Sequence, residues 1–219
     1  MVLKLYGTPF SSCTTRVMVC LHEKGAEFEL VMVDLFAQHH LQPQFLAKNP
    51  FGQVPVLEDG DGDLTLYESR AITSYVCEKF KDHGCDLLRR DDPKEAALVK
   101  MWMEVEAHQF NPSVAPIVVQ YLVCPLTGIE PDQSIIDSRM EKLGKVLDVY
   151  EGRLSGSKYL AGEFYSLADL HHLPYGFYLM RTPAASAINE RPHVKAWWES
   201  ISSRPSFAKV AEGMTIGNK

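Results

Sequence analysis

The chain has 219 residues, of which 46% are hydrophobic and 23% are charged, so it can bury a core as one large domain or as two small ones. Its net charge of −6 argues against nucleic acid or an anionic membrane as the main partner, and no apolar run approaches the ~20 residues that a membrane-spanning helix needs. The five cysteines have no metal-ligand spacing and the N-terminus lacks the apolar core of a signal peptide, so we expect free thiols and a cytosolic location.

Residues 1–80 alternate between strand-like and helical patterns. Strands are expected at 2–6, 28–33, 54–57 and 64–67, and helices at 14–24, 42–48 and 69–80. The first helix carries Val17, Cys20 and Leu21 on one face and ends at Gly25. The turn Asp59-Gly60-Asp61-Gly62 would join the last two strands. The order β-α-β-α-β-β-α predicts a small mixed sheet covered by helices.

The rest of the chain carries helical patterns only. An amphipathic stripe steps by four and three residues through Ile136, Met140, Leu143, Leu147, Tyr150 and Leu154. Ser166-Leu167-Ala168-Asp169 has the spacing of a capping box that opens a further helix. Another helix is expected around Val194, Trp197, Trp198 and Ile201, and a short last one begins at Arg204-Pro205.

Two domains follow from this change of pattern. We predict an α/β domain over 1–80, a charged linker over 81–92 and an all-helical domain over 93–219. Pro112 and Pro116 lie inside a helical run from 94 to 123, where we expect a bend because each proline removes a helix hydrogen bond.

Two short runs describe a possible binding cradle. Asn49-Pro50-Phe51-Gly52-Gln53-Val54-Pro55 sets up a turn and a strand, whose main-chain groups beside Pro55 can pair with an extended peptide. Glu68-Ser69-Arg70-Ala71-Ile72 opens a helix, whose first N–H groups can hold a carboxylate. Together they predict a site for a small anionic peptide, although each run taken alone is more typical of a plain hairpin loop or of an ordinary capped helix.

A hydroxyl group stands where the first strand turns into the first helix. A β-α-β-α-β-β-α unit with a proline-entered third strand is a thioredoxin-like arrangement, and this turn is where that fold carries its reactive group. Ser11, beside free N–H groups at the helix start, can donate to a substrate thiolate. Lowering a thiol pKa by about two units requires roughly 2.7 kcal/mol, which one or two charge-assisted hydrogen bonds together with the helix end can supply. The alternative is that Ser11 and Ser12 only cap the helix.

These motifs resemble those of the cytosolic glutathione transferases, most closely the plant phi class, nearly from end to end. The resemblance rests on the two runs above and on Lys4-Leu5-Tyr6-Gly7, Asp61-Gly62-Asp63-Leu64, Tyr159-Leu160-Ala161-Gly162 and His193-Val194-Lys195-Ala196-Trp197-Trp198. It implies a thioredoxin-like N-terminal domain, an all-helical C-terminal domain, a homodimer and glutathione as cosubstrate, with no metal.

The resemblance also implies roles near the first helix. The catalytic serine of the family lies five residues before the arginine of the first helix, which assigns Ser11 here because Arg16 follows at that distance; Ser12 is the near alternative. Related glutaredoxin-like proteins carry a cysteine at this place. Cys13 lies two positions later, so it is interpreted as a bystander near the site.

The implied glutathione-binding residues are Ser11, Ser12, His40, Gln53, Val54, Pro55, Glu68, Ser69 and Arg70. His40 would contact the glycyl carboxylate, and the neighbouring lysine of the family is replaced by Leu41. The Val54 backbone would pair with the cysteinyl part, held in place by a cis Val54-Pro55 bond. Ser69 would hold the γ-glutamyl carboxylate, and Glu68 would contact the ammonium group or orient the turn.

The second substrate should be apolar and electrophilic. Its pocket is expected between the domains, at residues that are equally typical of a plain core: Phe10, Leu35, Phe36, Phe110, Ile117, Tyr121 and Tyr178, with Ser12 beside them. Adjacent His39 and His40 rarely converge on one ion, so a metal pair there is not expected. Asp169 is expected to support folding rather than catalysis.

Three functions remain open at this point. The leading hypothesis is an enzyme in which Ser11 stabilises glutathione thiolate for attack on an electrophilic carbon or a lipid hydroperoxide, in detoxification and stress response. The second is a non-catalytic carrier of flavonoids, hormones or other apolar anions, which Leu41 favours mildly and Ser11 disfavours. The third, a protein-interaction module on the same fold, is disfavoured by the complete glutathione constellation.

Overall fold

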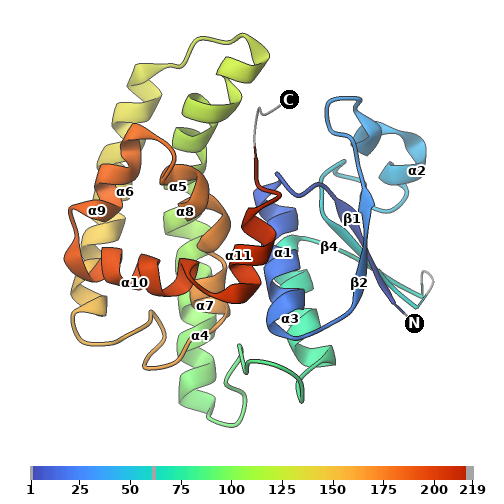
Figure 1. Ribbon diagram of the computed structural model, residues 1–219, viewed down its shortest axis with the longest axis horizontal. Coiled ribbons are helices and arrows are strands. Elements are labelled where there is room, and N and C mark those ends of the chain that lie inside the picture. Colours follow the sequence, from blue (N-terminus) through green and yellow to red (C-terminus); the bar gives the residue numbers. More distant parts are fainter. Residues whose placement is uncertain (1, 61–62, 216–219) are drawn as a thin grey trace. The chain divides into compact units, whose positions relative to one another are not determined.

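A computed structural model describes residues 2–60 and 63–215 of the chain (Figure 1). The described chain divides into two compact units, the first running up to Asp86 and including Lys209–Thr215, the second comprising Leu87–Ala208. The change from one unit to the other at Asp86 and Leu87 falls within the charged stretch 81–92. Asp61 and Gly62 of the predicted turn lie outside the described residues.

The first unit is built on a four-stranded mixed sheet. Its strands are β1 (Leu3–Gly7), β2 (Phe28–Met32), β3 (Val56–Asp59) and β4 (Leu64–Tyr67), in the spatial order β2-β1-β3-β4. Strand β1 runs parallel to β2 and antiparallel to β3, so that Leu5 lies opposite both Leu30 and Leu57. Strands β3 and β4 form an antiparallel pair. The predicted strand and helix order is confirmed.

Helices α1 (Ser12–Glu23) and α3 (Ser69–Lys79) lie side by side along one face of this sheet, and α2 (Pro43–Leu46) lies on the other side (Figure 1). Val17, Cys20 and Leu21 of α1 are fully buried, as their spacing predicts. A Cβ at Gly7 would lie 2.4 Å from Thr14 Oγ1, so only glycine lets β1 approach the first turn of α1 this closely. This close approach places the first turn of α1 beside the end of β1.

Helices are the only regular elements in the described part of the second unit. After α4 (Pro93–Val105) the chain continues as α5 (Asn111–Val118), and its later helices are α6 (Gln133–Leu154), α7 (Leu167–Leu170), α8 (Leu173–Leu179), α9 (Ser186–Asn189) and α10 (Pro192–Ser202). The last helix of the chain is α11 (Pro205–Ala211). No helix among residues 2–60 and 63–215 combines the length and the apolar character required to cross a bilayer.

The prolines of the second unit coincide with unusual helix winding. Both Pro112 and Pro116 lie in α5, and π-helical segments flank that helix at Glu106–Phe110 and Val119–Val123. The chain stays helical through both prolines and widens its turns on either side of α5; the expected bend stays a prediction. Proline has no N–H, so the regular i→i+4 hydrogen bond is missing where it stands. A wider turn with i→i+5 hydrogen bonds lets the helix continue past that gap.

The core of the second unit forms around the predicted stripe of α6. Leu143, Leu147 and Tyr150 are fully buried, whereas Met140 is only half-buried. The Tyr150 ring stands edge-on to Trp102, with 5.3 Å between centroids, and stacks on Phe110 with an interplanar angle of 22°. Aromatic pairs in these arrangements contribute beyond their buried area.

The capping box at the start of α7 is confirmed. Asp169 Oδ2 accepts hydrogen bonds from the Ser166 N–H at 3.0 Å and the Ser166 hydroxyl at 3.2 Å. Its Oδ1 accepts from the Leu160 N–H at 3.0 Å and from Trp197 Nε1 at 2.9 Å. The fully buried carboxyl therefore ties α7, α10 and the preceding loop together, which supports the structural role expected for it.

Candidate functional site

Three segments of the first unit meet at one small cleft: the first turn of α1, the loop before β3 and the start of α3. The cleft is lined by Cys13, Asn49, Gln53, Val54, Pro55, Glu68, Ser69 and Arg70. The two runs identified in the sequence therefore face the same space, although a hairpin separates them along the chain. Their juxtaposition is what the cradle hypothesis requires.

The loop before β3 is held by one buried amide. Asn49 is 3% exposed; its Nδ2 donates to the Gln53 carbonyl at 2.7 Å and its Oδ1 accepts from the Phe51 N–H at 3.1 Å. Gly52 has a φ of +59°, and a Cβ there would lie 2.9 Å from Leu41 Cδ2 and 3.2 Å from the His40 carbonyl oxygen. The loop is therefore held before Val54 by the hydrogen bonds of Asn49 and by the close approach of Gly52 to His40 and Leu41.

Val54 presents its main chain to the cleft. Its side chain packs against a cluster formed by Val33, Phe45 and Val56, and the Val54–Pro55 peptide bond is cis. Within residues 2–60 and 63–215 the Val54 N–H and C=O have no hydrogen-bond partner. Unpaired backbone groups at the edge of a site are what an extended peptide pairs with.

The start of α3 supplies a second set of donors. Glu68 precedes the helix with a φ of +67° and an exposed side chain, and Ser69 is the first helical residue, only 4% exposed. A positive φ is uncommon for a residue other than glycine and marks functional sites more often than others. The N–H groups that begin α3 favour a negatively charged group in the cleft.

A buried guanidinium connects the starts of α1 and α3. Arg16 is fully buried, and its Nη1 lies 2.7 Å from Ser69 Oγ and 3.7 Å from Cys13 Sγ. Its positive charge stands directly behind two side chains that line the cleft. Arg16 behind the lining and Arg70 within it place two positive charges at the cleft. Glu68 adds one exposed carboxylate to the same lining.

Ser11 and Ser12 lie at the N-terminus of α1. Ser11 is the N-cap residue, and its Oγ accepts a long hydrogen bond of 3.4 Å from the Thr14 N–H. No acceptor for the Ser11 hydroxyl hydrogen is found among the residues that the structure describes, so this hydrogen can serve a ligand. Ser12 begins the helix, and both serines are half-exposed. Neither serine is among the residues that line the small cleft, whereas Cys13, the next residue along the chain, is.

His40 lies beside the loop rather than in the cleft lining. It belongs to the 3-10 turn His39–Leu41, whose main chain contacts Gly52. Its Nδ1 is buried and has no hydrogen-bond partner within the described residues. Leu41, where the family has a lysine, is 48% exposed. The assignment of His40 to a glycyl carboxylate stays a prediction.

The residues expected to contact an apolar substrate fall in both units. In the first, the Phe10 and Phe36 rings lie 5.7 Å apart, Phe36 is largely exposed, and Leu35 packs on the Val33 cluster. In the second unit three of the residues are buried and the fourth is half-buried: Phe110, Ile117, Tyr178 and Tyr121 respectively. Their role toward a substrate stays a prediction.

The sequence interpretation missed two contributions to the cleft. In the motifs Arg16 served only to locate Ser11, and Asn49 was only one position of a run. In the structure Asn49 is a buried residue of the lining itself, and Arg16 is buried behind the lining. The available signal for Arg16 was a single charged residue within the otherwise uncharged run 11–21, directly before the buried position Val17. Among the described residues, no group of three or more His, Cys, Asp or Glu side chains is placed to hold a metal ion.

Comparison with known proteins covers the whole chain. The sequence matches the family described as glutathione S-transferase, N-terminal domain, over residues 1–78, and its C-terminal counterpart over residues 110–205. It is 58% identical to glutathione S-transferase F13 of Arabidopsis thaliana over 216 residues, which cover 99% of this chain and 98% of the relative. The crystal structure of glutathione transferase F7 from Populus trichocarpa superposes with a TM-score of 0.96 at 70% identity, covering 98% of this chain and 100% of that one. Glutathione S-transferase I from maize, solved in complex with an atrazine glutathione conjugate, gives a TM-score of 0.92 at 46% identity over 100% of both chains.

Proposed function

The chain belongs to the glutathione S-transferase family, in its plant phi class, and on that premise we propose that Ser11 activates glutathione held in the cleft between α1, the 49–55 loop and α3. The protein is an enzyme that uses glutathione as cosubstrate. The observation that carries the proposal is the meeting of Val54, Ser69 and Cys13 at one cleft, because Cys13 lies in the helix that Ser11 caps.

The chemistry of glutathione fits this cleft. The tripeptide carries two carboxylates, one ammonium and one thiol. The unpaired main chain of Val54 would pair with the cysteinyl residue, and the Ser69 hydroxyl with the α3 N–H groups would bind the γ-glutamyl carboxylate. Arg16 and Arg70 supply positive charge for that carboxylate, and the exposed Glu68 carboxylate is available for the ammonium group.

Ser11 would then act on the thiol. Its hydroxyl oxygen already accepts from the Thr14 N–H, so its hydrogen is the group left to donate. A donor aimed at sulfur favours the thiolate over the thiol, and the N-terminus of α1 adds to this preference. At a usual thiol pKa of about 8.5 only a few per cent of glutathione is ionised at pH 7, so lowering the pKa by about two units raises the thiolate fraction more than tenfold.

The thiolate would attack an apolar electrophile, forming a carbon–sulfur bond as the leaving group departs with the bonding electrons. We extend the proposal to organic hydroperoxides, where two glutathione molecules give glutathione disulfide, an alcohol and water. Phe10 and Phe36, whose rings lie together in the first unit, support a contact with an apolar substrate. Detoxification and stress response are the physiological roles that such chemistry would serve.

Two further properties belong to the proposal. A homodimer is supported by Phe51, which is 68% exposed on the loop that Asn49 holds rigid. A reducing compartment such as the cytosol is supported by the cysteines, all five of which are free.

The test is the ionisation of bound glutathione in Ser11→Ala, with Ser12→Ala as the matched control one residue away. Thiolate absorbance is titrated in the binary complex, and turnover is measured with an activated aryl halide. We expect Ser11→Ala to raise the thiol pKa by about two units and to lower kcat/KM roughly 10²-fold, while Ser12→Ala changes both much less. An unchanged thiol pKa in Ser11→Ala would refute the role of Ser11. A wild-type dimer that binds pigments tightly without turnover would favour the carrier function instead.

A further inference from the structure

Two buried cysteines face each other between α1 and α3. The Sγ atoms of Cys20 in α1 and Cys77 in α3 lie 3.7 Å apart, although the two residues are 57 positions apart in the chain. The Cys20 side chain is fully buried, and Cys77 is 3% exposed. Both belong to the first unit, and neither lines the glutathione cleft. The two thiols are therefore in direct contact at a place that the transfer reaction does not use.

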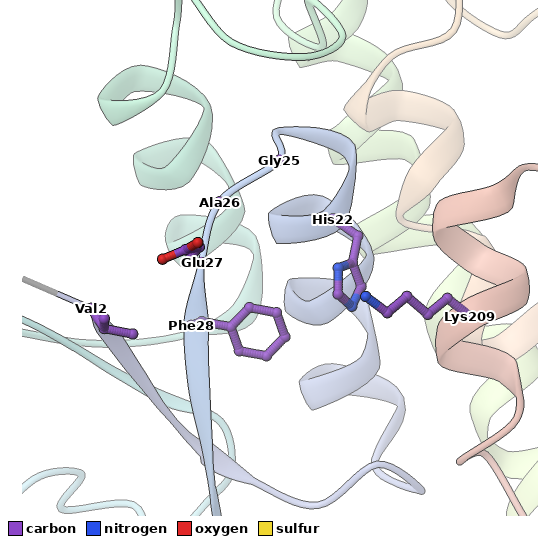
Figure 2. Close-up of a pocket in the computed structure, with 7 residues that line it drawn as sticks. All are labelled: Val2, His22, Gly25, Ala26, Glu27, Phe28 and Lys209. Atoms are coloured by element: carbon purple, nitrogen blue, oxygen red, sulfur yellow. The ribbon is translucent and has the colours of Figure 1, made fainter.

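The orientation of α1 turns Cys20 toward α3. His22, two positions further along the same helix, points toward Lys209 of α11 (Figure 2). Two positions correspond to about 200° around a helix, so Cys20 lies on the opposite face of α1. There its thiol also approaches the Thr73 carbonyl oxygen of α3, with 3.6 Å between Sγ and O. Two contacts with α3 thus hold the Cys20 sulfur beside Cys77.

A single buried cysteine would need no special explanation, because a free thiol packs as a small hydrophobic group. Cys124 of the second unit is an example, since it is buried and its sulfur lies 3.8 Å from the Gln120 side-chain oxygen. Cys20 and Cys77 differ from it because each sulfur has the other as its neighbour. Joining them requires the sulfurs to approach from 3.7 Å to about 2.05 Å, a small adjustment of two side chains and of the helices that carry them.

We propose that Cys20 and Cys77 are a site of oxidative modification, at which hydrogen peroxide converts the two thiols of the folded protein into a disulfide that links α1 to α3. Peroxide first transfers one oxygen to the Cys77 sulfur, giving a sulfenic acid and one water. The Cys20 thiol then attacks that sulfur, so that the S–S bond forms as the S–O bond breaks and a second water leaves with the remaining thiol proton. Two electrons pass from the two sulfurs to the peroxide.

Burial governs how the pair reacts. Burial raises the pKa of the Cys20 thiol well above its ordinary value, and the contact with Cys77 raises it further, so the pair reacts slowly and stays reduced without an oxidant. Once the disulfide has formed, its reduction requires a thiolate that reaches one of the two sulfurs. Glutathione is too large to reach sulfurs of residues that are 3% exposed or less. The cross-link should therefore persist beside the cosubstrate while the first unit is folded.

The cross-link should also stabilise the first unit. It closes a loop between residues 57 positions apart, which restricts the unfolded chain. It joins the two helices whose first turns carry Ser11 and Ser69, at positions further along each helix. The glutathione cleft is therefore left open, and the modification adds resistance to unfolding under oxidising conditions.

Peptide mapping tests the proposal. Folded wild type is incubated with hydrogen peroxide, treated with excess glutathione to reduce accessible disulfides, alkylated in denaturant and digested with trypsin. Cys20 and Cys77 fall in the tryptic peptides 17–24 and 71–79, each of which contains one cysteine. We expect these peptides to be recovered joined, with two hydrogens fewer than their summed mass. The midpoint of thermal unfolding should rise by about 5 °C or more over that of the reduced protein.

Cys77→Ala and Cys124→Ala are the matched pair of variants, since each removes one buried cysteine. After oxidation, Cys77→Ala should give neither the joined peptides nor the higher midpoint, whereas Cys124→Ala should give both. Before oxidation, both variants should turn over an activated aryl halide like wild type, because neither residue lines the glutathione cleft. This turnover also shows that the variants are folded.

The proposal is overturned if oxidised wild type yields no joined peptides, which includes the case in which glutathione reduces the cross-link in the folded protein. It is also overturned if the cross-linked protein unfolds at the same temperature as the reduced protein, or if Cys77→Ala shows the same rise as wild type. Because turnover is measured on reduced protein, none of these outcomes bears on the role of Ser11.

Discussion

Arg16 and Ser69, 53 positions apart in the chain, are joined by a buried hydrogen bond in which Arg16 Nη1 donates to Ser69 Oγ at 2.7 Å. Because the Ser69 oxygen accepts a hydrogen bond from the guanidinium, the hydroxyl hydrogen of Ser69 points in another direction. Ser69 lines the cleft, so this hydrogen can be donated to a ligand there. The same contact fixes the first turns of α1 and α3 relative to each other. It thus couples the helix that carries Ser11 to the helix expected to bind the γ-glutamyl carboxylate.

Replacing this guanidinium should weaken glutathione binding. In Arg16→Met the Ser69 hydroxyl loses a charged donor and the cleft loses a positive charge, so we expect glutathione affinity measured by calorimetry to fall about tenfold or more. Arg16→Lys keeps the positive charge but carries it on a single nitrogen without the guanidinium fork, so it should lose less affinity than Arg16→Met. Wild-type affinity in Arg16→Met, with the fold intact by circular dichroism, would contradict this role.

The double hydrogen bond of Asn49 predicts a loss of stability. Asn49→Ala leaves the Gln53 carbonyl and the Phe51 N–H without their buried partner, so we expect the free energy of unfolding of the first unit to fall by about 2–4 kcal/mol and KM for glutathione to rise. Asn189→Ala, at the exposed end of α9, is the control and should change stability by less than about 0.5 kcal/mol. If Asn49→Ala and Asn189→Ala unfolded at the same urea midpoint, the two hydrogen bonds of Asn49 would not stabilise the first unit.

Asp169 predicts a pH dependence of stability. Burial raises the pKa of its carboxyl from 3.8 to about 6, against the hydrogen bonds from Leu160, Trp197 and Ser166 that lower it. The folded state therefore binds more protons than the unfolded state between these values, so this group's contribution to stability is greatest below about pH 4 and falls as pH rises to about 6. The difference across this window should be about 2–4 kcal/mol.

The measurement for Asp169 is thermal unfolding from pH 4 to pH 7 in wild type, Asp169→Asn and, as an exposed control, Asp148→Asn. Asp169→Asn should lose this component of the pH dependence. It should also be less stable than wild type throughout, because its amide turns an N–H donor toward N–H donors. A profile parallel to wild type would show that Asp169 does not titrate in this range.

Phe51 predicts the oligomeric state. Its ring is 68% exposed and contacts Tyr67 edge-on at 5.9 Å between centroids, so it is held in place while facing outward. If the proposed homodimer forms through Phe51, Phe51→Ser should shift it toward monomer by light scattering after size exclusion, because an aromatic anchor buried in an interface contributes several kcal/mol. Phe36→Ser, which removes another exposed ring of the same unit, should leave the dimer intact. If both variants remain dimeric, Phe51 is not the anchor.

The elements of the fold were predictable because their signals are local. Val17, Cys20 and Leu21 mark the buried face of α1 through their spacing alone, and Ser166 with Asp169 marks the start of α7. The lining of the cleft by Val54 and Ser69 also followed from short motifs, since each motif fixes its own turn or helix start.

What the sequence did not predict depends on contacts between distant segments. The bond from Arg16 to Ser69 exists only because α1 and α3 pack together, and no local pattern encodes that pairing. Asn49 belongs to a recognised motif, but its two hydrogen bonds require the exact path of the loop. Pro112 and Pro116 indicate in the sequence that a backbone N–H is missing. They do not predict how the neighbouring helical turns adjust to its absence.

The π-helical turn Glu106–Phe110 has a consequence for the register of the second unit. A π turn holds one residue more than an α turn, so it takes up an additional residue while the helix that follows keeps its orientation about the axis. Val114 and Ile117 therefore stay fully buried although the chain before them carries that additional residue. Deleting one residue within 106–110 should close this turn into regular α-helix and keep the buried face of α5, whereas deleting one residue within α5 itself would rotate all that follows by about 100°.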